Sequence, residues 1–115
     1  MSDTCLFCKI AAKQIPAKLA YEDGRAVAFA DINPQAPVHL LVIPKSHITG
    51  AAALEAQDSE LVGHLFQVMN RLAREQGIAE SGYRIVTNNG AEAGQSVDHL
   101  HFHLLGGREM AWPPG

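Results

Sequence analysis

The chain has 115 residues, of which 47% are hydrophobic and 18% charged, and this is the size and composition of one folded domain. Nine basic and twelve acidic residues give a formal net charge of −3, and no basic run stands out, which excludes a binder of duplex nucleic acid. The sequence has neither an apolar run of roughly 18 residues nor a secretion signal, so we expect a cytoplasmic protein that does not engage a membrane.

Two helices are predicted. A short one, about residues 5–14, begins after Thr4, whose side chain can cap it, and ends before Pro16, because the residue preceding a proline avoids the helical region. A long one, about residues 59–76, places apolar side chains every three or four positions and stops at Gly77. The apolar stripe of the long helix predicts that it packs against a sheet.

Five strands are predicted around these helices. Asp23-Gly24 is a hairpin-turn dipeptide between the first two strands, and Pro44 stops the third. The strands are expected at residues 19–22, 26–31, 39–43, 83–88 and 97–105. These elements predict a single domain, residues 1–115, of the α+β class, in which a five-stranded, mainly antiparallel sheet has both helices on one face.

The sharpest feature is a run of alternating histidines, His99, His101 and His103, with apolar residues between them. Alternate residues of a strand share a face, so the three rings are expected to project together while Leu100 and Phe102 enter the core. A polar, solvent-facing strand would show the same pattern. A zinc site would use only two of the three histidines, because the outer pair would lie roughly 13 Å apart along the strand.

The same pattern suits nucleophilic catalysis at phosphorus. A neutral imidazole is available at pH 7 and forms an N–P bond that water can cleave, provided that an acceptor holds its other nitrogen. His101 has a histidine about 7 Å away on either side, so all three rings are expected to reach one phosphate. The loop Gly94-Gln95-Ser96 and the nearby Asn88 can supply further donors to that phosphate.

The remaining histidines and the cysteines have more ordinary interpretations. His39 begins a strand and His47 lies in a polar turn, and a histidine in either place is usually exposed. No function is assigned to His64. Cys5 and Cys8 are three residues apart. In a reducing compartment this spacing is typical of a metal or redox pair more than of a structural disulfide.

Together, these residues resemble the histidine triad family and, within it, the Hint branch. Besides the triad, the resemblance rests on residues 15–18, 29–34, 37–39, 42–45 and 94–96 and on the ending Trp112-Pro113-Pro114-Gly115, so it covers nearly the whole chain. His103 in the third triad position resembles the hydrolases, because the related nucleotidyltransferases have glutamine there. The branch that hydrolyses dinucleoside polyphosphates lacks the tail.

The resemblance implies hydrolysis of the P–N bond of purine nucleoside 5′-phosphoramidates, with release of AMP or GMP, through a nucleotidyl-histidine on His101. His103, His39 and Ser96 would complete the catalytic group, with His39 in a hydrogen-bonded relay. Asp31 would bind the ribose hydroxyls. The residues implied to bind the nucleotide are Phe7, Ile10, Phe29, Asp31, Ile32, Asn88, Gly94, Gln95, Ser96, His101 and His103. Taken singly, the apolar members of this set are equally well explained by core packing.

The resemblance also implies a homodimer, in which Trp112 reaches the partner's active site. In relatives with a Cys-x-x-Cys pair it implies one structural zinc per chain, not required for the chemistry. The implied zinc ligands are Cys5, Cys8, His47 and His99. Two buried thiols without a metal are the alternative. Asp98 departs from the family pattern, which has an aromatic residue or histidine there, and is expected on the face opposite the triad.

Two other functions fit the same residues. One is a nucleotide-binding regulatory module with weak residual hydrolysis, which would bind purine nucleotides but turn them over slowly. The other is a zinc hydrolase, which would lose its activity on chelation.

Overall fold

The computed structural model describes residues 4–115. Within this range the regular elements are α1 (Leu6–Ala11), β1 (Leu19–Glu22), β2 (Ala26–Ala30), β3 (Val38–Pro44), α2 (Ser59–Glu75), β4 (Tyr83–Val86) and β5 (Phe102–Gly106). Short 3-10 turns, η1 to η3, occur at Ala51–Ala53, Ala56–Asp58 and Ala91–Ala93. A helix able to span a bilayer is not found among the described residues.

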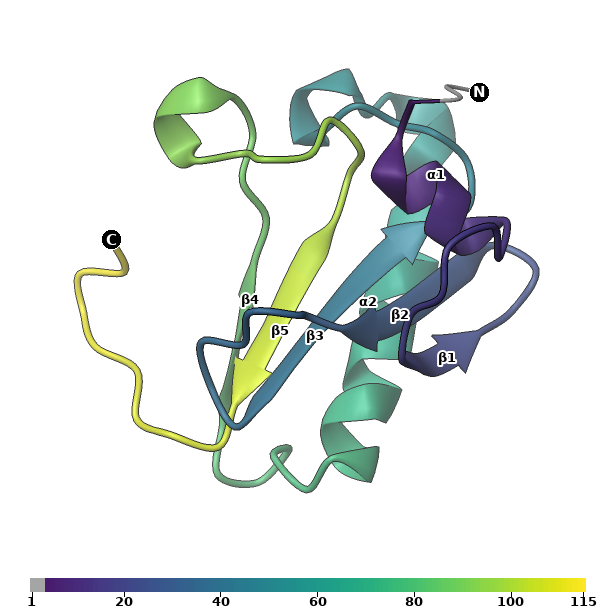
Figure 1. Cartoon of the computed structure of the whole chain (residues 1–115). Helices are drawn as coiled ribbons and strands as arrows, with labels where there is room; N and C mark the ends of the chain where they lie inside the picture. Colours follow the sequence, from purple (N-terminus) through teal and green to yellow (C-terminus); the bar gives the residue numbers. More distant parts are fainter. Residues whose placement is uncertain (1–3) are drawn as a thin grey trace.

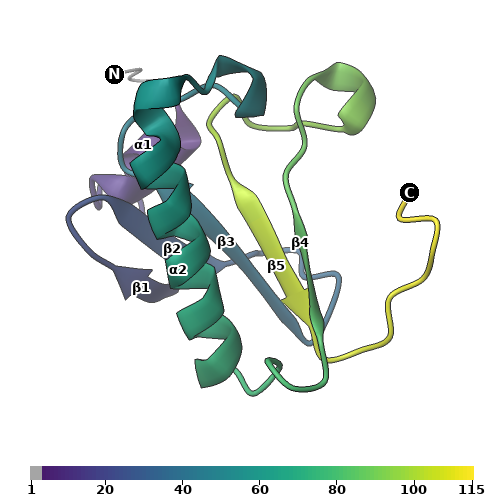
Figure 2. The same cartoon turned by 180° about the vertical axis from the view of Figure 1, so that it is seen from behind.

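The predicted α+β fold is confirmed. In the described chain the strands form one sheet in the order β1-β2-β3-β5-β4, and every neighbouring pair is antiparallel. The long helix α2 crosses one face of this sheet, behind it in Figure 1 and in front of it in Figure 2. Its apolar stripe, with Leu65, Met69 and Leu72 fully buried, packs against Val42 and Leu104 of the sheet.

The short helix lies on the opposite face, so the prediction that both helices share one face is wrong. α1 packs Phe7 and Ile10 against Val27, Phe29 and Leu41, whereas α2 packs on the alternate residues of the same strands. Apolar residues follow one another without alternation along β2 and β3, and such runs indicate strands that are buried on both faces. The two helices therefore sandwich the middle of the sheet (Figures 1 and 2).

The last strand is shorter than predicted, because it begins at Phe102 instead of Val97. The partner strand β3 ends at Pro44, which has no N–H to continue the ladder. The N–H of Leu100 donates instead to the carbonyl of Ile48, beyond the end of β3, at 2.6 Å. Residues 97–101 thus lie outside the strand ladder. The alternation of side chains still continues from His99, because Leu100 packs with Phe102 and Leu104 in the core under α2, whereas His99 and His101 both contact Phe7 of α1.

The cap of α1 also differs from the prediction. Cys5, not Thr4, is the N-cap, and its Sγ accepts a hydrogen bond from the N–H of Cys8 at 3.3 Å. The helix ends at Ala11, and Lys13 follows with φ of 61°, a left-handed conformation that no α-helix can include. The predicted residues 12–14 therefore form a turn.

The turn between β1 and β2 is joined to α2 by one carboxylate. Asp23 Oδ1 accepts from the N–H groups of Arg25 and Ala26 at 2.7 and 2.8 Å. Its Oδ2 lies 2.7 Å from the Tyr21 hydroxyl and 2.6 Å from His64 Nε2 on α2. His64 thus has a structural contact on the face of the sheet that α2 covers.

Candidate functional site

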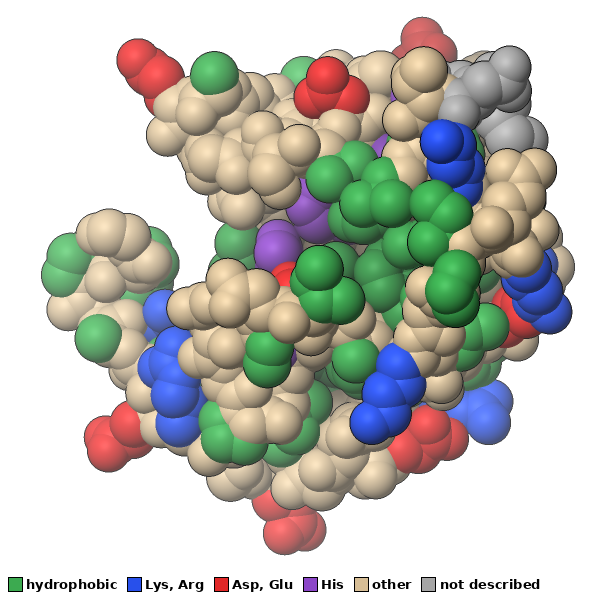
Figure 3. Space-filling model, in the orientation of Figure 1, with side chains coloured by type: hydrophobic (Ala, Val, Ile, Leu, Met, Phe, Trp, Pro, Cys, Tyr) green, Lys and Arg blue, Asp and Glu red, His purple; other side chains and the backbone are tan. Residues whose placement is uncertain are grey.

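A cleft of about 710 Å³ opens on the α1 face of the sheet. Part of its floor is a row across three adjacent strands, with Phe29 opposite Leu41 and Leu41 opposite His103. Figure 3 shows this hollow, with apolar side chains beside the histidines. The lining residues are Leu6, Phe7, Ile10, Ile15, Pro16, Ala17, Lys18, Phe29, Ala30, Asp31, Ile32, Leu41, Ser96, Val97, His101 and His103.

The structure brings together all five residues predicted for the base and the ribose, which are Phe7, Ile10, Phe29, Asp31 and Ile32. The rings of Phe7 and Phe29 meet edge to face with centroids 5.5 Å apart. Ile32 is fully exposed, so core packing does not explain it. Asp31 is partly exposed, and its Oδ1 accepts the N–H of Asn33 at 2.9 Å. Its Oδ2 lies 3.4 Å from His39 Nε2.

Further lining residues were not predicted individually. Leu6 is 44% exposed and precedes the predicted Phe7 on α1. Leu41 and Val97 reach the cleft from β3 and from the segment before β5. In the sequence these three residues are ordinary apolar positions, and residues 15–18 carry only the family resemblance. Their role depends on how α1 is placed over the sheet.

His101 lines the cleft in a defined tautomer. Its Nδ1 donates to the backbone carbonyl of His99 at 2.7 Å, so in the neutral ring Nε2 carries the lone pair. The residue is 4% exposed, and Phe7 packs edge-on against its ring with centroids 5.0 Å apart. An imidazole held in this way by an acceptor meets the structural requirement for a nitrogen nucleophile.

His39 and His103 form a relay whose proton positions follow from the backbone. The N–H of Gln35 donates to His39 Nδ1 at 3.0 Å, so the proton of the neutral His39 ring is on Nε2. His39 Nε2 donates to His103 Nδ1 at 2.9 Å, and Asp31 Oδ2 lies 3.4 Å from the same nitrogen. His103 Nδ1 is then an acceptor, and the His103 proton is on Nε2. His39 is buried, contrary to the exposure expected for a histidine at a strand start.

Burial keeps both rings of the relay neutral. Desolvation lowers the pKa of His39, although Asp31 acts in the opposite direction. Desolvation, followed by the charges of His101 and His39, lowers the pKa of His103 to about 4. At neutral pH, His103 is therefore a hydrogen-bond donor without a charge.

Asp31, His39 and His103 also lie close enough to suggest a metal site, since their ligand atoms are within 4.8 Å of one another. The hydrogen bond from Gln35 argues against it. That bond occupies the Nδ1 lone pair of His39, so Nε2 keeps its proton and has no lone pair for a metal. The geometry suits a proton relay better than a cation.

The predicted zinc ligands Cys5, Cys8, His47 and His99 come together, with their ligand atoms within 4.8 Å of one another. His99 Nδ1 is 3.3 Å from Cys5 Sγ, 3.5 Å from Cys8 Sγ and 3.2 Å from His47 Nδ1, and Cys8 Sγ is 3.2 Å from His47 Nδ1. Ligands of a tetrahedral zinc lie roughly 3.3–3.8 Å apart. His99 Nε2 donates to the Pro44 carbonyl at 2.9 Å, which leaves the Nδ1 lone pair for a metal. This buried cluster is compatible with a structural zinc.

This arrangement corrects one expectation. The three triad rings do not converge on one phosphate, because His101 and His103 line the cleft and His99 joins the cysteines. His99 is fully buried. Its ring stays on the α1 face, where Phe7 contacts both His99 and His101, but its Nδ1 is directed to the two cysteines.

The loop before the triad has two different roles. Ser96 lines the cleft, whereas Asn88, Gly94 and Gln95 are not among its lining residues. Asn88 lies beyond the end of β4, and Gly94 adopts a left-handed conformation with φ of 84°. The Gln95 amide accepts from the Gly90 N–H at 2.8 Å and donates to the Thr49 carbonyl at 2.8 Å, so its side chain organises the loop.

A second cavity, of about 500 Å³, adjoins the cleft. It is lined by Thr4, Cys5, Leu6, His47, Ser96, Val97 and Asp98, of which Leu6, Ser96 and Val97 also line the cleft. Asp98 is exposed here, and not on a face opposite the triad, because residue 98 lies before the strand begins.

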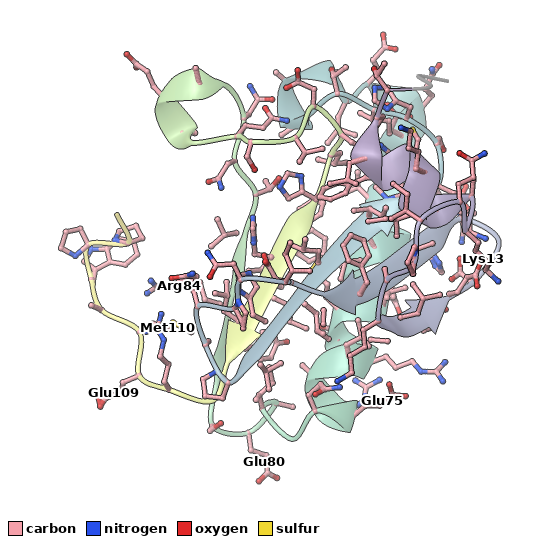
Figure 4. The ribbon with its side chains drawn as sticks, in the orientation of Figure 1. Lys13, Glu75, Glu80, Arg84, Glu109 and Met110 are labelled. Atoms are coloured by element: carbon pink, nitrogen blue, oxygen red, sulfur yellow. The ribbon has the colours of Figure 1, made fainter. Side chains whose placement is uncertain are left out.

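The C-terminal tail runs away from the sheet past β4, as Figure 4 shows around Arg84 and Met110. The Arg84 guanidinium donates to the Ala111 carbonyl at 2.9 Å and lies over the Trp112 ring at 6.0 Å. Trp112 is 81% exposed. A large aromatic side chain held in this way is available for contact with another molecule.

The sequence model of the HIT domain family matches residues 12–110. The chain belongs to the HIT family. A solved HIT family hydrolase from Legionella pneumophila is 51% identical, covers 97% of this chain and 100% of its own, and superposes with a TM-score of 0.96. The histidine triad nucleotide-binding protein of Candida albicans is 32% identical over 96% of this chain and 83% of its own, with a TM-score of 0.82.

A further relative is the 14 kDa zinc-binding protein of Zea mays. It is 50% identical over 112 residues, which are 96% of this chain and 87% of that relative. The predicted HIT family membership is thus confirmed by sequence and by fold.

Proposed function

We propose that this HIT protein, as a member of the Hint branch, hydrolyses the P–N bond of purine nucleoside 5′-phosphoramidates and releases AMP or GMP. The observation that carries the proposal is a pair of rings in one cleft. His101 offers a lone pair at Nε2, and His103 offers a proton at Nε2. The first suits attack on phosphorus and the second suits a phosphate oxygen. The names of two solved relatives, a hydrolase and a nucleotide-binding protein, support it.

The cleft suits a purine nucleoside phosphate. Its volume of about 710 Å³ is in the range of small-ligand pockets, and its apolar walls around Phe7 and Phe29 match the faces of a flat base. The Asp31 carboxylate can accept hydrogen bonds from both ribose hydroxyls. The Ser96 hydroxyl can donate to the phosphate or to the leaving group, in the same cleft.

The reaction has two steps. In the first, His101 Nε2 attacks the α-phosphorus, an N–P bond to the ring forms, and the bond from phosphorus to the amine breaks. The ring becomes positively charged, and the His99 carbonyl stabilises that charge through the Nδ1–H. In the second step, water attacks phosphorus and breaks the N–P bond to the ring. The amine gains a proton and the nucleotide gains a hydroxyl, so one water is added across the P–N bond.

The Cys5, Cys8, His47 and His99 cluster would hold a zinc that fastens α1 to the sheet. Four protein ligands form a closed set, so the metal supplies structure and has no open position for substrate. His99 links the two sites, because its ring belongs to the cluster and its carbonyl holds His101. A still-folded protein that loses all turnover on chelation would favour a zinc hydrolase instead.

The test is steady-state kinetics on adenosine 5′-phosphoramidate. His101→Ala is expected to lower kcat by roughly three orders of magnitude or more while AMP binding persists. His64→Ala is the matched control, since this histidine contacts Asp23 on the other face of the sheet, and it should keep its turnover. If His101→Ala retains more than about a tenth of wild-type turnover, the nucleophile is wrongly assigned. If the wild-type protein binds AMP but hydrolyses the phosphoramidate only weakly, the alternative of a nucleotide-binding regulatory module is favoured.

The proposal includes a homodimer. The exposed Trp112 would reach the partner's cleft and shape the site of the leaving amine, supported in its place by Arg84. Sedimentation of the purified protein tests the dimer. A monomer at micromolar concentration with unchanged turnover would contradict this part of the proposal.

A further inference from the structure

The arrangement of Cys5 and Cys8 suits a reaction between them as well as metal binding. Cys5 caps α1 and Cys8 follows in its first turn, with its N–H donating to Cys5 Sγ at 3.3 Å. Residues three apart on a helix have Cα atoms roughly 5 Å apart, which is within the range that a disulfide spans. The two sulfur atoms already lie within 4.8 Å of each other. A disulfide can therefore form without unwinding α1.

An oxidant from solvent meets one of the two sulfurs first. The cavity of about 500 Å³ beside the cluster is lined by Cys5 but not by Cys8. Cys5 is 8% exposed, and Cys8 is 3% exposed. A molecule as small as hydrogen peroxide can enter this cavity, so the path from solvent leads to Cys5.

We propose that Cys5 and Cys8 are a peroxide-sensitive dithiol in which Cys5 is oxidised first and Cys8 resolves it. The Cys5 thiolate attacks one oxygen of hydrogen peroxide, the O–O bond breaks, and Cys5 becomes a sulfenic acid while hydroxide leaves. The Cys8 thiolate then attacks the Cys5 sulfur, the S–O bond breaks, and a disulfide forms. Two thiolates, one peroxide and two protons become one disulfide and two waters. A zinc held by Cys5 and Cys8 would bind both sulfurs as thiolates, the nucleophilic form.

Oxidation removes both sulfur ligands from the cluster and leaves only the imidazoles of His47 and His99. Two imidazoles are too few for a closed tetrahedral zinc site, so the metal is released. The helix that carries both cysteines also carries Phe7, whose ring lies against His101. A change in α1 is therefore transmitted to the nucleotide cleft. Only this last consequence rests on the proposed function.

The first experiment titrates the zinc-loaded full chain with hydrogen peroxide. Zinc release is followed with a chromogenic chelator, and the disulfide is detected by peptide mapping. The chain has two cysteines, so every lost thiol is assigned to this pair. Zinc release in step with a Cys5–Cys8 disulfide is expected. Stoichiometric peroxide that leaves both thiols and the zinc in place would overturn the proposal.

The second experiment tests which cysteine reacts first. Cys8→Ser exposed to peroxide and a sulfenic acid trap should carry the trap on Cys5, whereas Cys5→Ser should carry little on Cys8. Since either variant can fold poorly, the same trap is also used on wild-type protein under brief oxidation. Label on Cys5 is expected there, and equal or greater label on Cys8 would overturn the order.

AMP affinity before and after oxidation measures the effect on the cleft separately from activity. Weaker AMP binding by the oxidised protein, recovered on reduction with zinc, is the expected result. Unchanged AMP affinity in fully oxidised protein would overturn the transmission through Phe7 while the disulfide chemistry stands. A reduced protein that does not bind AMP at all would instead contradict the proposed function.

Discussion

Acidification provides a quantitative test of the neutral histidine relay. Burial lowers the pKa of His103 to about 4, whereas an unfolded histidine has a pKa near 6.5. Between these values the unfolded chain binds a proton at this position that the folded chain does not bind. The stability contributed by the neutral ring is therefore fully present above about pH 6.5 and is lost as the pH falls toward 4.

The size of the effect follows from the two pKa values. A pKa of about 4 against an ordinary 6.5 corresponds to roughly 3 kcal/mol of lost unfolding free energy below pH 4. Domains of this size have about 5–15 kcal/mol in total, so the loss is a large fraction. His39 acts in the same direction, since burial lowers its pKa as well.

The assay is urea unfolding at several pH values from 7 to 4, on wild-type protein and on His103→Asn. Asparagine does not titrate, and its side-chain oxygen can replace Nδ1 as acceptor for His39. Both proteins are measured with chelator, so that acid release of zinc does not contribute. The stability of wild type relative to the variant is expected to fall by roughly 3 kcal/mol across this range. Parallel losses in the two proteins would refute a buried neutral His103.

Further predictions concern the loop, the sheet, the metal and the tail. Gln95→Ala should lower stability by roughly 1–3 kcal/mol in urea unfolding, because its amide joins three backbone groups; an unchanged midpoint would contradict this role. Gly106→Ala should lower the free energy of unfolding by roughly 1–3 kcal/mol, because the added Cβ would lie 2.6 Å from Ile78 Cδ1. Gly63→Ala is the control: its added Cβ meets open space, so it should stabilise α2 by up to about 1 kcal/mol. Chelation should lower the Tm of the zinc-loaded protein, and a Tm that ignores both zinc and chelator would reduce the cluster to buried thiols. Deletion of residues 110–115 should alter preference among leaving amines more than AMP affinity, and unchanged selectivity across a set of amines would contradict the role of the tail.

The sequence by itself determined the elements that depend on neighbouring residues, which are the long helix and the first hairpin. The apolar stripe at helical spacing predicts α2 to within one residue at its end, because helix hydrogen bonds and side-chain neighbours are both close in the chain. The Asp23-Gly24 signal predicts the β1–β2 hairpin for the same reason. The triad and the Cys-x-x-Cys spacing likewise identify which side chains carry the chemistry, since the residue types alone limit what they can do.

The residue pattern by itself does not divide those side chains between two sites. The family resemblance implies the division, and the tertiary structure brings the two groups of side chains together in separate places. His99 belongs to the cysteine cluster because the fold places α1, with Cys5 and Cys8, and the His47 turn beside its ring. His39 is buried because β3 is the middle strand of the sheet; the apolar run of β3 indicates a buried strand but does not specify which strands flank it. The tautomers of His39 and His101 depend on backbone groups of Gln35 and His99, which are close in the chain but whose directions are fixed only when the backbone folds. Residue types specify the chemistry that is available, whereas long-range strand pairing specifies which atoms meet.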